Sequence, residues 1–128
     1  MNSKHNVYLR KHYKKMLGKE PIGVGDGWFD ILNCLFFQLK WDIDKNKYPN
    51  VTITCIKEKF GTLRVYAACN EIQHAAIRFA EALSAKICED CGTFQDVKIR
   101  GDSWIRTLCS KCDKAFAKRR KEQFNAES

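Results

Sequence analysis

The chain has 128 residues, 23 Lys and Arg against 15 Asp and Glu, a formal net charge of +8, and seven cysteines. This length suits one compact domain with a small appended module and excludes a two-domain enzyme. There is no run of about 18 apolar residues, so no transmembrane helix is expected, and the polar, basic start of the chain argues against a signal peptide. We therefore expect a cytoplasmic protein with reduced cysteines, for which metal ligation is the first role to consider.

The basic excess lies at the two ends of the chain. Residues 1–19 hold six basic residues and no acidic one, and residues 111–128 hold six basic and three acidic residues. The part between them holds eleven basic and twelve acidic residues and is close to neutral. Charge of one sign clustered at a terminus attracts polyanions such as nucleic acid or an acidic protein surface. The same charge can also serve only to keep a protein soluble.

A short basic helix is predicted over residues 4–17, because Leu9, Tyr13, Met16 and Leu17 fall on one of its faces. Pro21 and glycines at positions 23, 25 and 27 then indicate a loop or hinge over residues 19–27.

A stronger helix is predicted over residues 28–44, with Asp26 as its N-cap. Its apolar stripe consists of Trp28, Phe29, Leu32, Leu35, Phe36, Leu39 and Ile43. So broad a stripe places this helix at the centre of the core. It is also wider than a small sheet can cover, which leaves a homodimer open.

Two strands and another helix follow. Residues 51–56 and 63–69 are rich in β-branched and aromatic side chains and predict a β-hairpin with Gly61 in its turn. Asn70 is the predicted N-cap of a helix whose apolar face is Ile72, Ala76, Phe79, Leu83 and Ile87. The predicted fold class is α+β, with helices packed on one face of a small antiparallel hairpin or sheet.

Four cysteines form two Cys-x2-Cys pairs, Cys88 with Cys91 and Cys109 with Cys112, separated by seventeen residues. This spacing is typical of a zinc ribbon, because each pair aims two thiolates at one point and two pairs complete a tetrahedron. Short strands predicted over residues 95–99 and 103–108 would return the second pair beside the first. We expect one structural Zn²⁺ per chain; two disulfides, an iron–sulfur cluster and a redox pair are weaker alternatives.

The remaining cysteines, Cys34, Cys55 and Cys69, are predicted to fill the core as small apolar groups. The chain has three histidines but no nucleophile elbow, phosphate-binding glycine loop or metalloprotease motif. A four-thiolate zinc site is closed to substrate. The protein is therefore predicted not to be an enzyme.

Four surfaces are candidates for binding: the basic first helix, the segment of residues 57–64, the ribbon around Trp104, and the basic run of residues 113–124. Basic side chains interleaved with aromatic ones can hold phosphates and stack bases. Phe60 could instead pack on the core, and Trp104 could cover the junction of ribbon and core or lie under Arg106. The candidate residues are Lys11, Lys14, Lys15, Lys57, Lys59, Phe60, Arg64, Trp104, Arg106, Lys114, Lys118, Arg119, Arg120 and Lys121.

These features divide the chain into four segments. They are a basic amphipathic N-terminal helix (1–19), an α+β core (20–87), a zinc ribbon (88–112) and a basic C-terminal helix or tail (113–128).

The motifs GDGWFD (residues 25–30), KEKFGTLR (57–64), CEDCG (88–92) and WIRTLCSKC (104–112) occur in this order. Together they resemble a family of small uncharacterised proteins encoded mainly by bacteriophages and prophages. Other members often have a histidine where this chain has Cys112. The resemblance implies a phage accessory protein acting in the host cytoplasm, and it implies no activity and no site residues beyond the four metal ligands.

Two functions are therefore predicted as alternatives. The first is a non-enzymatic zinc-binding protein that associates with nucleic acid through its basic terminal segments. The second is a phage inhibitor of a host protein or antiviral defence system, acting as a protein binder or as a sink for an anionic nucleotide signal. Neither function involves a membrane.

Overall fold

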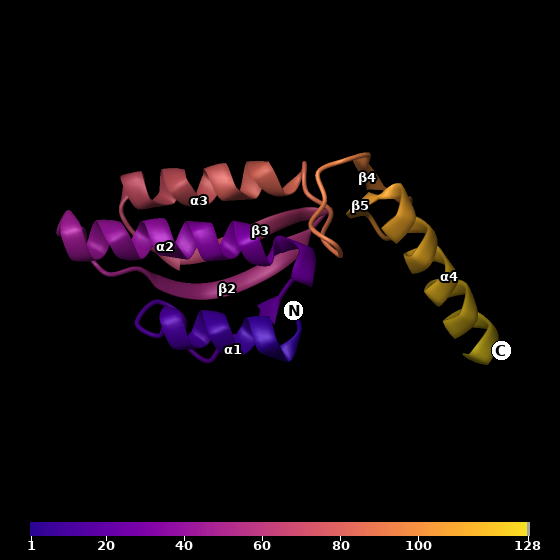
Figure 1. Ribbon diagram of the computed structural model, residues 1–128, viewed down its shortest axis with the longest axis horizontal. Helices are drawn as coiled ribbons and strands as arrows, with labels where there is room; N and C mark the ends of the chain where they lie inside the picture. Colours follow the sequence, from indigo (N-terminus) through magenta and orange to yellow (C-terminus); the bar gives the residue numbers. More distant parts are fainter. Residues whose placement is uncertain (128) are drawn as a thin grey trace.

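The computed structural model describes residues 1–127, so Ser128, the end of the predicted basic tail, lies outside the described residues. Three helices pack on one face of a three-stranded sheet, and a two-stranded hairpin followed by a long helix stands at one end (Figure 1). This confirms the α+β class. The elements are α1 (Ser3–His12), β1 (Ile22–Gly23), η1 (Asp26–Trp28), α2 (Phe29–Lys45), β2 (Thr52–Lys59), β3 (Thr62–Ala68), α3 (Glu71–Ser84), β4 (Val97–Arg100), β5 (Arg106–Cys109) and α4 (Ser110–Glu127).

The sheet is mixed, with the order β1-β2-β3, rather than purely antiparallel. β1 pairs in parallel with β2 through Ile22↔Ile56 and Gly23↔Lys57, inside the segment that the sequence predicts as a loop. A strand of two residues is too short to leave a pattern of alternating side chains. Ile22 is buried, and the strand exists because the edge of β2 supplies its hydrogen-bond partners.

The β2–β3 hairpin has a tighter turn than predicted. Lys59 pairs with Thr62, so that only Phe60 and Gly61 form the turn. Both have positive φ, 53° and 83°, as a type I′ turn requires. Gly61 therefore has the predicted role, while Phe60 accepts a backbone conformation that costs a side chain some energy.

α1 is shorter than predicted, because it ends at His12 and the chain continues in turns. The four predicted apolar residues are nevertheless buried in one cluster with α2 and the sheet. Tyr13 packs edge-on against Phe36 of α2, and Leu17 forms an isolated bridge with Ile53. The apolar spacing thus identifies the buried side chains correctly, although it overestimates the length of the helix.

α2 has the predicted central position, since Trp28, Leu32, Phe36 and Leu39 are fully buried. Its N-cap differs from the prediction. Asp26 lies in the 3-10 turn η1 and does not cap α2. The N-cap residues are Gly25 for η1 and Trp28 for α2, and neither makes a side-chain capping hydrogen bond. Oδ1 of Asp26 instead accepts from the backbone N–H of Asn2 at 2.6 Å and lies 3.2 Å from Nδ1 of His5. Asp26 therefore ties the start of the chain to the α2 entry loop.

α3 begins as predicted, with a capping box in which Asn70 and Gln73 each bond the other's backbone N–H. Its buried face is predicted only in part, because Ala76 and Ile87 pack against the core but the other three predicted residues are exposed. Ile72 and Phe79 are 61% and 71% exposed, whereas the buried side chains are one position further along: Gln73, Ile77, Ala80 and Ser84.

Two of these buried side chains are polar and satisfied by hydrogen bonds. Gln73 Nε2 donates to the carbonyl of Pro49 at 2.7 Å, and Ser84 Oγ accepts from the N–H of Leu63 at 2.9 Å. Burying a polar group costs little when it is bonded in this way. A count of apolar residues cannot reveal these partners, and it therefore selects a face of α3 that is offset by one residue.

The three cysteines outside the pairs do not all fill the core. Cys34 is exposed on α2, which contradicts the prediction, while Cys55 and Cys69 are half-buried. Cys34 is exposed because it lies on the side of α2 that faces away from the sheet.

Among residues 1–127, none of the helices combines the length and the apolar character needed to cross a membrane.

Candidate metal centre

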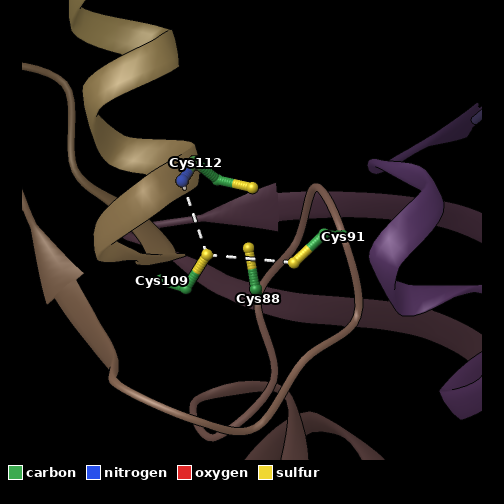
Figure 2. A group of neighbouring side chains, drawn as sticks. All are labelled: Cys88, Cys91, Cys109 and Cys112. Atoms are coloured by element: carbon green, nitrogen blue, oxygen red, sulfur yellow. Dashed lines mark hydrogen bonds between the residues drawn. The ribbon is translucent and has the colours of Figure 1, made fainter.

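The two cysteine pairs converge on one point (Figure 2). Cys88 and Cys91 lie in the loop after α3, Cys109 ends β5, and Cys112 lies in the first turn of α4. The pairing of Val97 with Cys109 in the β4–β5 hairpin carries the second pair back to the first. All four sulfur atoms lie within 4.8 Å of one another, as the predicted zinc ribbon requires.

The spacing of the sulfurs fits a metal ion of the size of zinc. Tetrahedral ligands at about 2.3 Å from Zn²⁺ stand about 3.8 Å from each other. The Sγ atoms of Cys91 and Cys109 are 3.8 Å apart, and all seven cysteines are free. This separation is far longer than the roughly 2.05 Å of a disulfide. The cluster is thus positioned to hold one metal ion, and its four thiols are the donor set of a structural zinc site.

The surroundings of the thiols favour their ionised form at one position. The backbone N–H of Cys112 donates to Sγ of Cys109 at 3.4 Å and, together with hydrogen bonds from the other three cysteines, lowers the pKa of the Cys109 thiol to about 7. Burial raises the pKa of Cys112 instead. Four thiolates so close together repel one another, and a bound dication would remove this repulsion. Four protein ligands would leave it no open position for a substrate.

The first cysteine turn is docked on the glycine-rich loop of residues 23–27. The N–H of Gly27 donates to the carbonyl of Glu89 at 2.7 Å, and the indole Nε1 of Trp28 donates to the carbonyl of Ile87 at 2.8 Å. A Cβ on Gly27 would lie 2.1 Å from the carbonyl oxygen of Cys88. The loop therefore packs closely against the cysteine turn and supports it. It does not have the hinge role that its composition suggests.

Glu89 also belongs to this joint, the contact between the first cysteine turn and the core. Its side chain is buried, accepts from the N–H of Gly25 at 2.9 Å and pairs with Arg106 at 3.3 Å. Burial raises the pKa of the Glu89 carboxyl, although Gly25 and Arg106 oppose the shift. Thr107 completes the joint, because its hydroxyl donates to the carbonyl of Gly61 in the β2–β3 turn. The alternating glycines are the only signal in the sequence that could have pointed to this joint.

The ribbon and α4 share a cluster of aromatic and arginine side chains. Trp104 packs edge-on against Phe116 of α4, with ring centroids 5.1 Å apart. Arg120 lies over the indole of Trp104 at 5.4 Å, and Arg106 lies over Phe116 at 4.6 Å. An arginine therefore covers the indole, but it is Arg120 and not Arg106. Trp104 packs on α4 and keeps 51% of its surface exposed.

The predicted binding residues fall into two groups. Lys11, Lys14 and Lys15 are exposed where the chain leaves α1, at the end of the molecule opposite α4 (Figure 1). The second group lies on the β2–β3 hairpin and on the ribbon with α4, which meet at Gly61 and Thr107. The lysines at the end of α1 are thus far from α4, while the hairpin tip adjoins the ribbon. Phe60 is 67% exposed and does not pack on the core.

Comparisons of this chain with models of protein families, with curated proteins and with solved structures found no match. The resemblance to phage-encoded proteins accordingly stays a prediction. The four-cysteine cluster is the feature of that resemblance that the structure supports.

Proposed function

We propose that this protein is a non-enzymatic, zinc-binding accessory protein, encoded by a phage or prophage, that binds nucleic acid in the host cytoplasm. Its binding surface is the ribbon-end surface, formed by the open face and tip of the β2–β3 hairpin together with the exposed side of Trp104 and α4. A closed metal site organises such a surface without taking part in chemistry.

The observation that carries the proposal is a set of unpaired cations on the open face of the sheet. Lys57 and Arg64 are direct cross-strand partners, and like charges in this position repel each other. In the part of the chain that the structure describes, no carboxylate forms an ion pair with Lys57, Lys59 or Arg64. Phosphate groups would relieve this repulsion.

Exposed aromatic rings accompany these cations. Tyr66 and Phe60 are 44% and 67% exposed, with Lys57 5.4 Å above the first ring and Lys59 5.7 Å above the second. Alternating cations and ring faces are suited to a single strand, whose bases stack while its phosphates are neutralised. We therefore expect single-stranded nucleic acid to bind more tightly than a duplex.

The ribbon and α4 extend this surface. Arg120 is exposed beside Trp104, and Lys114, Lys118 and Lys121 are exposed along α4. Two other predicted residues have internal partners. Arg106 pairs with Glu89 and Asp90, and Arg119 lies 3.5 Å from Asp90. We therefore assign Arg106 and Arg119 to holding the ribbon and α4 together.

Fluorescence anisotropy with labelled single strands and duplexes, measured from low to physiological salt, tests the proposal. The affinity should fall steeply with salt, because each neutralised phosphate releases a counterion. If neither ligand binds even at low salt, the proposal is wrong.

Two charge-matched triple variants locate the surface. Lys57→Gln, Lys59→Gln and Arg120→Gln together should make the logarithmic salt dependence shallower by about two to three. Lys11→Gln, Lys14→Gln and Lys15→Gln remove the same charge at the opposite end and should change it less. An equal effect of the two variants would indicate attraction by net charge alone.

A pull-down from host lysate, with and without nuclease, separates this proposal from the alternative of a host-protein inhibitor. Recovery that depends on nucleic acid supports the proposal. One stoichiometric protein that resists nuclease supports the inhibitor instead.

A further inference from the structure

The outer face of α2 and α3, turned away from the sheet, carries several exposed apolar side chains. Phe37 and Trp41 on α2 are 58% and 49% exposed, and Phe79 and Ile72 on α3 are 71% and 61% exposed. Leu83 adds a further 39% exposed side chain. These five residues, here called the outer helix face, do not belong to the ribbon-end surface.

The outer helix face has both a ridge and hollows. Phe37 and Trp41 stack on each other, with centroids 6.2 Å apart, and stand along α2. On one side of them, a groove of about 410 Å³ lies between α2 and α3, with Leu35, Ala76 and Ala80 among its lining residues. On the other side, a groove of about 350 Å³ separates α2 from Tyr8 and His12 of α1.

The exposed apolar area is a large part of what a dimer interface needs. With roughly 200 Å² for each aromatic side chain, Phe37, Trp41 and Phe79 alone expose about 350 Å². Ile72 and Leu83 enlarge this patch to the upper range of what a monomer ordinarily exposes, about 300–600 Å². Neighbouring side chains and backbone would bring it close to the roughly 800 Å² that each partner buries in a stable interface.

The groove between α2 and α3 carries little charge, which suits an apolar surface such as that of a second copy. Among the described residues 1–127, Asp30 is the only charged one that lines the groove between α2 and α3, whereas Lys40, Asp44 and Lys45 line the groove beside α1. The basic cluster at the end of α1 adjoins the groove beside α1, and the other basic cluster lies on the ribbon-end surface. A twofold contact centred on the groove between α2 and α3 would therefore keep these clusters at its edge or outside it, despite the net charge of +8.

We propose that two copies of this chain form a twofold symmetric dimer through the outer helix face. In such an interface the same patch serves both partners, so the patch must contain a projection and a matching hollow. The Phe37–Trp41 ridge of one copy would lie in the groove between α2 and α3 of the other, and the reverse contact would follow by symmetry. The dimer would leave both ribbon-end surfaces open.

The molar mass of the nuclease-treated, zinc-loaded chain, measured by light scattering after size exclusion at micromolar concentration, tests the proposal. High salt in the buffer suppresses bridging by residual nucleic acid. We expect twice the chain mass of 14.9 kDa. A chain that stays monomeric into the high micromolar range overturns the proposal.

Substitutions locate the interface. Trp41→Glu and Phe79→Glu should each weaken dimerisation roughly tenfold or more, as the loss of a buried aromatic anchor does. Phe124→Glu is the matched control, because Phe124 on α4 is also 71% exposed but lies outside the outer helix face. Circular dichroism and zinc content should be unchanged in all three. A dimer that persists in both α2–α3 variants shows that the interface lies elsewhere.

The wild-type chain provides a second readout that does not depend on any variant. Cys34 is exposed and lines the groove between α2 and α3. Its maleimide labelling rate, followed by mass spectrometry of its peptide, should fall as the protein concentration rises. A rate independent of concentration contradicts the proposal. A lysate protein that protects Cys34 in a monomeric chain would also contradict it, because the face would then bind a different partner.

Discussion

The α+β core and the ribbon are held together by different forces. The core has one apolar cluster that draws a buried side chain from each of its helices and strands, including Leu9, Ile22, Leu32, Leu63 and Ile77. The buried cluster of the ribbon consists of Cys88, Leu108 and Cys109. Two of these three residues are candidate metal ligands. Burial of apolar surface therefore stabilises the core, while we expect the ribbon to depend on a bound metal ion.

The contrast matters because the two regions share a joint. The glycine-rich loop, Glu89 and Thr107 connect the first cysteine turn to the core through hydrogen bonds and close backbone contacts. The core can consequently serve as a fixed base on which the ribbon folds when metal binds. The following substitutions are designed to test this division, from the largest expected effect to the smallest.

Loss of the metal should unfold the ribbon and leave the core folded. A structural zinc site contributes on the order of 10 kcal/mol to local folding. In Cys109→Ser, or in the wild type after chelation, amide exchange should become fast in β4 and β5 and stay slow in α2 and β2. Cys34→Ser is the control, because the exposed Cys34 is not a ligand, and it should retain one zinc per chain. A metal-free ribbon with protected amides would contradict this assignment.

Leu32→Ala should destabilise the core and leave the metal site of the ribbon intact. The fully buried Leu32 leaves a cavity when truncated, which costs about 2–5 kcal/mol in the free energy of unfolding. Denaturant unfolding measures this loss, and the zinc content should remain at one per chain. Leu32→Met conserves volume and should cost less than about 1.5 kcal/mol. Release of zinc by Leu32→Ala under native conditions would show that the two regions are not separately stabilised.

Gly27→Ala tests the joint itself. Its Cβ would meet the carbonyl oxygen of Cys88 at 2.1 Å, so that the loop or the cysteine turn must shift. We expect a loss of about 1–3 kcal/mol, as for other overpacked sites, together with weaker metal binding. Gly18→Ala is the matched control, because no atom lies within 4 Å of its added Cβ. Equal stability of the two variants would show that the close packing at Gly27 does not stabilise the joint.

Asn70→Ala should have the smallest effect and should be confined to the core. It removes the acceptor for the N–H of Gln73 at the start of α3, which costs about 1 kcal/mol. Asn70→Asp keeps an acceptor there and should restore most of the stability. Thermal unfolding of both variants, with zinc content as the second readout, checks this expectation. A change in zinc affinity would be inconsistent with a local cap.

Some of this protein is determined by the sequence alone, because the controlling interactions lie within a few residues of each other. The four ligands follow from two Cys-x2-Cys turns, the start of α3 follows from Asn70 and Gln73, and the turn at Gly61 follows from its backbone freedom. The burial of α2 is also predictable, since a stripe as broad as the one from Trp28 to Leu39 must be covered.

The tertiary structure decides the features that depend on distant partners. β1 exists because β2 lies beside it, and α3 buries Gln73 and Ser84 because Pro49 and Leu63 bond them. Gly27 supports the cysteine turn because Cys88 and Glu89, which are distant in the sequence, pack against its backbone. Spacing along a sequence records which side chains can share a face, but contacts between distant segments determine which face is buried.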